Sequence, residues 1–251
     1  MNFPLIPPGQ QFPRAVHVPS AGLAGNEPRR DTPVTTYSLA TDRDFEWQAV
    51  YDFWFPAGLE AANLDTHWRT LEWWMRGGTN AELPQFAPLI EAAKSRRLNH
   101  WLASPRGRLA LILVLDQFPR GLFAGSPEAY AYDEQALLIA EEGLQNGDYE
   151  ALVSPWEKFF FVLPLAHTEG PGHLERMRRV VAAGETIATD APAHLQPLYH
   201  FSLSQARGHF DVITRFGRFP HRNAILGRVS TPDELAYMEK GDFVHMRQLP
   251  R

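Results

Sequence analysis

Residues 109–120 have the sequence Leu-Ala-Leu-Ile-Leu-Val-Leu-Asp-Gln-Phe-Pro-Arg, and this stretch decides the fold. Its apolar run has no polar face, so a helix formed by it must be covered on every side by other helices. We therefore predict a central, buried helix. The same helix carries Asp116, Gln117 and Arg120 into or beside the core, where an unpaired charge is costly. We expect these three side chains to meet polar partners from other parts of the chain.

The starts of several helices are marked by a hydroxyl residue followed by proline. This pair places a side-chain acceptor at the N-cap and proline at the first helical position, where its missing N–H costs nothing. The pair occurs at Ser104-Pro105, Ser126-Pro127, Ser154-Pro155 and Thr231-Pro232. In the last two, a glutamate three residues after the cap completes a capping box. These signals predict a helical protein.

Strand signals are scarce, because no long stretch alternates apolar and polar residues. We predict an all-α fold of antiparallel helical hairpins. The expected helices span residues 44–55, 65–76, 84–102, 105–118, 127–145, 155–166, 171–184, 192–215 and 232–240. Residues 1–42 are rich in proline and glycine without helical periodicity, which predicts an extended or disordered arm. Residues 43–251 show no break in composition, and we assign them to one helical domain.

The overall composition narrows the range of partners. The chain has 251 residues and a formal net charge of -5, so nothing electrostatic indicates nucleic acid or an anionic membrane. It contains no cysteine, which excludes disulfides, thiolate metal sites and cysteine nucleophiles. No apolar run approaches the roughly 20 residues of a membrane helix, and no signal-peptide pattern opens the chain. We expect a cytoplasmic protein that does not enter a membrane.

A second polar stretch follows the apolar run of residues 159–166, where a helix is expected to end. It places His167 two residues before Glu169. A carboxylate beside an imidazole fixes the tautomer of the ring and raises its basicity, as a general base requires. The alternative is a surface loop in which the histidine caps the end of the helix.

A third polar stretch starts on the predicted helix of residues 192–215, where Ser202, Gln205 and His209 share one otherwise apolar face. The loop of residues 215–228 then carries four arginines together with His221 and Asn223. Arginine suits bidentate contact with a carboxylate or phosphate. The alternative is a structural network in which these arginines neutralise buried acids and the ends of helices.

Familiar catalytic signatures are absent from the sequence. It has no nucleophile elbow, P-loop, dinucleotide glycine pattern or His-Glu-x-x-His motif. A metal bound by histidine and carboxylate side chains is chemically possible, with His167, Glu169, His209, His221 and Asp116 as available ligands. Their spacing does not single out such a site, so we predict no metal ligands, and no cofactor is indicated.

Several motifs occur in a fixed order along the chain: Phe53-Trp54-Phe55, Trp101, the end of the stretch 109–120, Leu-Pro-Leu-x-His-x-Glu at 163–169, His209, Phe-Gly-Arg-Phe-Pro-His-Arg-Asn at 216–223, and Leu-Gly-Arg at 226–228 before Ser230-Thr231. Together they resemble the bacterial family known as domain of unknown function 924, over about residues 45–243. The resemblance implies an all-helical fold related to tetratricopeptide-like hairpins, in a family whose biochemical role is uncharacterised.

The resemblance also implies which positions the pattern of the family retains: Asp116, Gln117, Arg120, His167, Glu169, His209, Arg218, His221, Arg222 and Asn223. It brings no established catalytic residues. This chain departs from the pattern in having Thr168 where the family usually has serine, and in its arm of residues 1–42, which lies outside the usual start of the family.

Our leading hypothesis is a small-molecule enzyme with a pocket that gathers the three polar stretches. Arg120, Arg218 and Arg222 would bind a carboxylate or phosphate, and His209 or His167 would act as general acid or base. Asp116 or Glu169 would orient the imidazole. Further substrate-binding candidates are Gln117, His221, Asn223, Ser202 and Gln205.

The alternative hypothesis is a tetratricopeptide-like scaffold that binds a peptide or protein partner, with the polar motifs serving as internal struts. The two hypotheses differ in the surface that they require. An open apolar groove favours the scaffold, whereas a closed pocket lined by the motif side chains favours the enzyme.

Overall fold

The structure is a computed structural model that describes residues 45–250, and its regular elements are all helices. The predicted arm of residues 1–42 lies outside this part of the chain. The α-helices are α1 (Trp47–Trp54), α2 (Leu64–Met75), α3 (Ala87–Lys94), α4 (Pro105–Leu122), α5 (Asp133–Gln145), α6 (Asp148–Ala151), α7 (Pro155–His167), α8 (His173–Asp190), α9 (Gln196–Phe216) and α10 (Pro232–Lys240). Short 3₁₀ helices connect them: η2 (Leu59–Ala61), η3 (Leu83–Phe86), η4 (Asn99–Ala103), η5 (Pro127–Tyr130), η6 (Pro220–Arg222) and η7 (Val244–Met246). The predicted all-α fold is confirmed.

Helix α4 is the central helix that the apolar run predicts. Every residue from Gly107 to Arg120 is buried. The side chain of Ser104 accepts a hydrogen bond from the backbone N–H of Gly107 at 3.1 Å and caps the helix as expected. Helix α4 contacts α1, α3, α5, α6 and α7, so its sides are covered by other helices, as a helix without a polar face requires.

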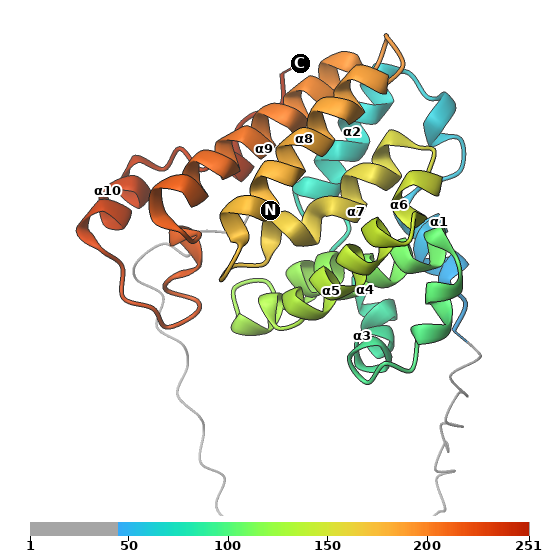
Figure 1. The fold of residues 1–251 in the computed structure, drawn as a ribbon, viewed down its shortest axis with the longest axis horizontal. Helices are drawn as coiled ribbons and strands as arrows, with labels where there is room; N and C mark the ends of the chain where they lie inside the picture. The colour runs from blue at the N-terminus through green and yellow to red at the C-terminus, as the bar shows by residue number, and fades with distance from the viewer. Residues whose placement is uncertain (1–44, 251) are drawn as a thin grey trace, which may run out of the picture.

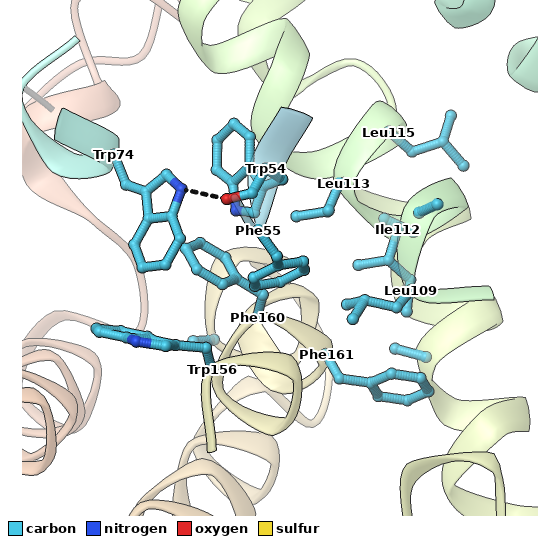
Figure 2. Close-up of a cluster of buried hydrophobic side chains, with 14 of the residues drawn as sticks. Trp54, Phe55, Trp74, Leu109, Ile112, Leu113, Leu115, Trp156, Phe160 and Phe161 are labelled. Atoms are coloured by element: carbon cyan, nitrogen blue, oxygen red, sulfur yellow. Dashed lines mark hydrogen bonds between the residues drawn. The ribbon is translucent and has the colours of Figure 1, made fainter. Parts of the chain in front are cut away.

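Aromatic side chains from α1, α2 and α7 fill the space beside α4 (Figure 2). The rings of Trp54 and Trp74 stack with centroids 6.2 Å apart, and Phe160 lies edge-on to both rings. The indole N–H of Trp74 donates to the carbonyl oxygen of Trp54 at 3.0 Å, which joins α2 to the end of α1. These large side chains bury much apolar surface, which stabilises the packing of the three helices against α4.

Helices α7, α8 and α9 form the second half of the fold. Helix α8 packs against both α7 and α9, and α9 also contacts α2. Figure 1 shows α8 and α9 side by side as a long hairpin, with α10 beyond one end of it. Helices α4 and α7 also contact each other.

Two predicted helices are interrupted in the structure. The expected helix of residues 84–102 is divided into η3, α3 and η4. Helix α3 ends where Arg96 adopts a φ of 60° and the N–H of Arg97 donates to the carbonyl of Ala92, which is the hydrogen bond of a Schellman motif. The expected helix of residues 127–145 is divided into η5 and α5. At the first break residues 95–97 are exposed and Leu98 is buried, and at the second Ala131 is exposed and Asp133 is buried. Tertiary packing after each break therefore outweighs the local preference for a continuous helix.

Two helices continue past prolines. Helix α4 was expected to end at residue 118, but it runs through Pro119 to Leu122, and α7 contains Pro164. Proline in a helix interior removes one backbone hydrogen bond. Phe118, Pro119 and Arg120 are all buried, so packing of this last turn offsets that loss. The continuation matters for the site, because it places Arg120 on the same helix as Asp116.

The lengths and compositions of the described helices can be compared with those of membrane-spanning helices. Among residues 45–250, no helix combines the length and the apolar character needed to cross a lipid bilayer.

Candidate functional site

A partly enclosed pocket of about 150 Å³ lies where the ends of α4 and α7 face the α8 and α9 hairpin. The pocket has a polar half, whose lining includes Gln117, Arg120, His167, His209, His221 and Arg222. These side chains come from all three polar stretches of the sequence. The fold therefore brings together residues that lie up to about a hundred positions apart in the chain, as the leading hypothesis requires.

His167 forms one wall of the pocket and is held by a buried carboxylate. Its Nδ1 lies 2.8 Å from Oδ1 and 2.9 Å from Oδ2 of Asp116, whose side chain is 0% exposed. An ionised carboxylate only accepts hydrogen bonds, so Nδ1 carries the proton and donates it. The other ring nitrogen, Nε2, forms no hydrogen bond within residues 45–250 and keeps its lone pair. Gln117 also donates to Asp116 through its side-chain amide.

Two arginines line the pocket beside His167. Arg120 forms an ion pair with Asp116 at 3.2 Å, and its Nη2 donates to Asp133 at 2.8 Å. Arg222 approaches the same Asp133 oxygen at 3.5 Å and donates to the carbonyl oxygen of His167 at 2.8 Å. We call the five residues Asp116, Arg120, Asp133, His167 and Arg222 the pocket network.

The orientation of the pocket network gives the lining its electrostatic character. Arg120, Arg222 and His167 line the cavity, whereas Asp116 and Asp133 lie behind them and do not. The guanidinium of Arg222 is held between two aromatic rings, 4.5 Å from the centroid of Tyr130 and 4.6 Å from that of Phe219. Such stacking keeps a cation in place without consuming its hydrogen-bond donors. The hydrogen-bond donors that these residues present to the cavity are therefore cationic or neutral, and neither carboxylate of the network faces it.

Burial and neighbouring charges shift the pKa values of the Asp116 and His167 pair. Burial acts to raise the pKa of Asp116, but the charge of Arg120 and the hydrogen bonds from His167 and Gln117 outweigh it and hold that pKa well below its usual range. Burial lowers the pKa of His167, and Asp116 opposes this only in part. At neutral pH the pair is thus a carboxylate beside a neutral imidazole.

Three further histidine rings that line the pocket lie close to one another. The ring centroids of His221 and His245 are 4.6 Å apart, and the ring of His209 lies parallel to that of His245 at 6.4 Å. Burial is the main cause that lowers their pKa values, to about 4 for His245 and well below the ordinary value for His209 and His221. These imidazoles are uncharged at neutral pH and can each donate and accept one hydrogen bond.

The histidines do not converge as metal ligands. Within the part of the chain that the structure describes, no three His, Asp or Glu side chains come together in an arrangement that could hold a metal ion. The geometry thus gives no support to the metal site considered from the sequence.

The other half of the pocket is apolar, with a lining that includes Phe159, Val162, Met177, Val180, Ile187 and Leu203. Ser202 lies at the edge of this half and donates to the carbonyl of Leu198 at 3.2 Å, which leaves its oxygen able to accept. Two lining residues, Tyr199 and Gln205, each have a buried side-chain oxygen without a hydrogen-bond partner among residues 45–250. Buried polar atoms of this kind are uncommon and mark places where a ligand or water completes the hydrogen bonding.

Comparison with known proteins identifies the family. Residues 50–242 match the bacterial proteins of unknown function designated DUF924. The chain belongs to this family. A solved structure from Agrobacterium tumefaciens, of the protein of unknown function ATU0120, is similar to this DUF924 protein with a TM-score of 0.60 and 32% sequence identity. The similarity covers 78% of this chain and 97% of that one. A search among curated proteins found no match.

Glu169, a predicted catalytic residue of this DUF924 protein, neither lines the pocket nor contacts a histidine that does. Glu169 was expected to orient a histidine, but it forms an ion pair with Arg228 and accepts the backbone N–H of Phe219 at 2.6 Å. Helix α7 ends at His167, so Glu169 lies in the following loop and points toward the segment after α9. Of the two carboxylates proposed to orient an imidazole, only Asp116 contacts one.

Two predicted substrate-binding residues also lie outside the pocket. Arg218 donates to Glu234 at 2.7 Å and 2.8 Å, and Asn223 donates to Glu234 at 3.2 Å. Glu234 is itself the capping-box residue of α10 and accepts the N–H of Thr231 at 2.8 Å. These contacts hold the loop of residues 217–231 against α10, and the structure does not bring Arg218 and Asn223 to the pocket. We call Glu169, Arg218, Asn223, Arg228 and Glu234 the loop network.

Sequence reasoning missed several residues that shape the pocket. Asp133 starts α5 and pairs with both pocket arginines, and Tyr130 stacks on Arg222 from η5. An aspartate in the first turn of a helix has an ordinary explanation in the helix dipole, so its sequence position gave no sign of a second role. His245 and Tyr199 were missed because neither lies in a stretch with an unusual polar pattern.

Proposed function

We propose that this DUF924 protein is an enzyme that uses His167 for general acid–base catalysis on a small anionic molecule bound by Arg120 and Arg222. The observation that carries the proposal is the Asp116 and His167 pair at the wall of a pocket whose other charged lining is cationic. A histidine with one nitrogen fixed by a carboxylate and the other free is the arrangement that general-base catalysis requires.

Each member of the pair has a separate role. His167 is neutral at neutral pH, so its Nε2 can accept a proton from a substrate in the cavity. Asp116 keeps the proton on Nδ1 and stabilises the imidazolium that forms when Nε2 is protonated. Gln117 and Arg120 hold Asp116 in place through its other contacts. His209, in contrast, contacts no carboxylate among the described residues, so we assign His167 rather than His209 as the acid or base.

The remaining polar lining binds and orients the substrate in this proposal. Arg120 and Arg222 attract its negative charge, and preorganised donors of this kind cost little reorganisation during a reaction. The neutral rings of His209 and His221 and the side chains of Ser202 and Gln205 supply further hydrogen bonds. We infer no metal or organic cofactor in these steps.

The pocket also bears on the alternative of a tetratricopeptide-like scaffold. A scaffold binds its peptide or protein partner along an extended concave surface. Here the polar stretches contribute to a small pocket, which supports the enzyme in preference to the scaffold. We also propose a cytoplasmic location, which fits the absence of cysteine and a small anionic substrate.

The direct test is turnover of metabolites by the purified protein. We expect the wild type to consume at least one compound from a bacterial small-molecule extract, followed by mass spectrometry. The His167→Gln variant keeps a polar side chain but loses the base, and we expect its rate to fall by about 10²–10⁴-fold. His200→Gln is the matched control, because His200 lies on the exposed side of α9, and it should retain the full rate.

A substrate-free measurement supports the same test. Nitrogen NMR of the histidine rings should show His167 with its proton on Nδ1 at neutral pH, and Asp116→Asn should weaken that preference. Equal turnover by wild type and His167→Gln, with both proteins folded, would exclude His167 as the acid or base.

A further inference from the structure

The size of the pocket limits what it holds. Its volume is about 150 Å³, and an apolar cavity of roughly that size accommodates a benzene ring. Pockets for drug-sized ligands are larger, roughly 300–1,000 Å³. A nucleotide or a folded peptide segment therefore does not fit inside, whereas a single ring or a short hydrocarbon chain with one polar head does.

The charges in the polar half limit the ligand to one negative charge. The two guanidinium groups of Arg120 and Arg222 are balanced by Asp116 and Asp133 immediately behind them. Both terminal nitrogens of Arg120 already donate, to the backbone carbonyl of Asp116 and to the side chain of Asp133. Arg222 uses only Nη1 within residues 45–250. One free guanidinium edge with neutral imidazoles beside it matches a monoanion, whereas a dianion would leave buried charge without compensation.

The apolar half gives the ligand a direction. Side chains from α7, α8 and α9, among them Val162, Val180 and Leu203, line it. Burial of a ring or chain against them stabilises binding in proportion to the apolar surface removed from water. A small anion without an apolar body would leave this half unfilled.

We propose that the ligand of this site is a small monocarboxylate with a short apolar body, either aromatic or aliphatic. Its carboxylate contacts Arg222 and the neighbouring histidines and is attracted by the charge of Arg120, and its body extends between α7, α8 and α9. The inference rests on the proposed function in taking this pocket as the site, and it names the substrate class.

Isothermal titration calorimetry with the wild-type protein is the first test. The probes are benzoate and hexanoate, their neutral amides, acetate as a carboxylate without an apolar body, and phenyl phosphate as a dianion. We expect benzoate or hexanoate to bind at least about tenfold more tightly than its amide, acetate or phenyl phosphate, since a charge-assisted hydrogen bond and the buried body each contribute to affinity. This comparison needs no variant.

Two pairs of variants locate the ligand. Ala206→Phe fills the apolar half and should abolish binding, whereas Ala182→Phe on the exposed side of α8 should leave it unchanged. Arg222→Gln removes the free guanidinium and should weaken acid binding by about tenfold or more without changing amide binding. Arg215→Gln, at an exposed position of α9, is its control.

The outcomes separate this inference from the proposed function. Tighter binding of phenyl phosphate, or binding of neither acid, would overturn the monocarboxylate. Acid binding unaffected by Ala206→Phe would place the ligand elsewhere and also overturn it. Acid binding in a protein whose turnover does not depend on His167 would leave the inference standing and remove the catalytic role. His167-dependent turnover of a compound without a carboxylate would support the catalytic role and overturn the monocarboxylate.

Discussion

The pocket network and the loop network are built from the same residue types but have different surroundings. Both pair arginines with buried or half-buried carboxylates, and both draw on the loop after α9. In the pocket network, Arg120, Arg222 and His167 line a cavity with their carboxylates behind them. In the loop network, the acids and arginines are directed at each other, at the cap of α10 and at backbone groups. No member of the loop network lines the pocket.

This difference shows that a cluster of charges in a motif does not by itself mark a functional site. Arg218 and Arg222 lie four positions apart in one loop, yet Arg218 secures α10 and Arg222 faces the cavity. Both arginines pair with a buried carboxylate. The distinction is whether a group keeps donor or acceptor capacity toward a space that a ligand can enter, and variants that separate the two networks test it.

The largest expected effect comes from the centre of the pocket network. Asp116→Asn keeps the shape of the side chain but removes the charge, so Arg120 and Arg222 must share the single carboxylate of Asp133. Breaking a buried ion pair in this way costs about 3–5 kcal/mol. We expect a loss of that size in the free energy of unfolding, measured with urea. Asp211→Asn, at an exposed position of α9, should change it by less than about 0.5 kcal/mol.

A smaller loss is expected when the loop network is broken. Glu234→Ala removes the acceptor for Arg218 and the capping box of α10. Because the Arg218 side chain is 29% exposed and can be solvated, we expect a destabilisation of about 2 kcal/mol. Benzoate affinity should stay within about twofold of wild type. A loss of affinity equal to that of Arg222→Gln would mean that the two networks act as one.

Acid is expected to lower the free energy of unfolding through the buried histidines of the pocket. The pKa of His245 is lowered from 6.5 to about 4, so between these values the unfolded chain binds more protons than the folded one. Stability is therefore expected to fall as the pH drops below 6.5, with His245 contributing at most about 2 kcal/mol by pH 5. His209 and His221 act in the same direction.

The measurement is the thermal midpoint of unfolding at neutral pH and at pH 5 for wild type and His245→Phe. The variant keeps a ring beside His221 and Phe243 but cannot be protonated. It should lose less stability than wild type over this range. An identical decrease in both proteins would show that His245 does not contribute to the acid sensitivity.

The smallest effect is expected at a pair that belongs to neither network. Arg179 and Glu141 form two hydrogen bonds, at 2.7 Å and 2.9 Å, and their side chains are 42% and 25% exposed. Arg179→Ala should cost about 0.2–1 kcal/mol in urea unfolding, and added salt should reduce the difference. A loss as large as that of Asp116→Asn would show that burial is not what separates these ion pairs.

The candidate site was only partly predictable from sequence. Asp116, Arg120 and His167 stood out because each polar group adjoins an apolar run, and the structure places all three in the pocket network. The same criterion also selected Glu169 and Arg218, which contact other groups outside the pocket. Local sequence does not show which way a side chain in a loop will face. Arg228, the partner of Glu169, lies far along the chain from it. Glu234, the partner of Arg218, lies beyond the loop in α10.

Contributions from segments without a pattern of their own could not be predicted at all. Tyr130 reaches the pocket, and Asp133 reaches the arginines that line it, because η5 and α5 form two helices rather than one. His245 reaches it because η7 packs against α9. Each placement depends on how whole helices dock, and docking depends on contacts between residues distant in sequence.

The sequence by itself determined that the protein is helical, where many helices begin and which helix is central. These features follow from interactions within a few residues, such as the caps at Ser104 and Thr231 and the unbroken apolar run before Asp116. Only the tertiary structure decided which charged residues share a pocket and which secure a loop. The reason is that a charge in a folded protein acquires its role from its neighbours in space, and the packing of α4, α7, α8 and α9 selects those neighbours.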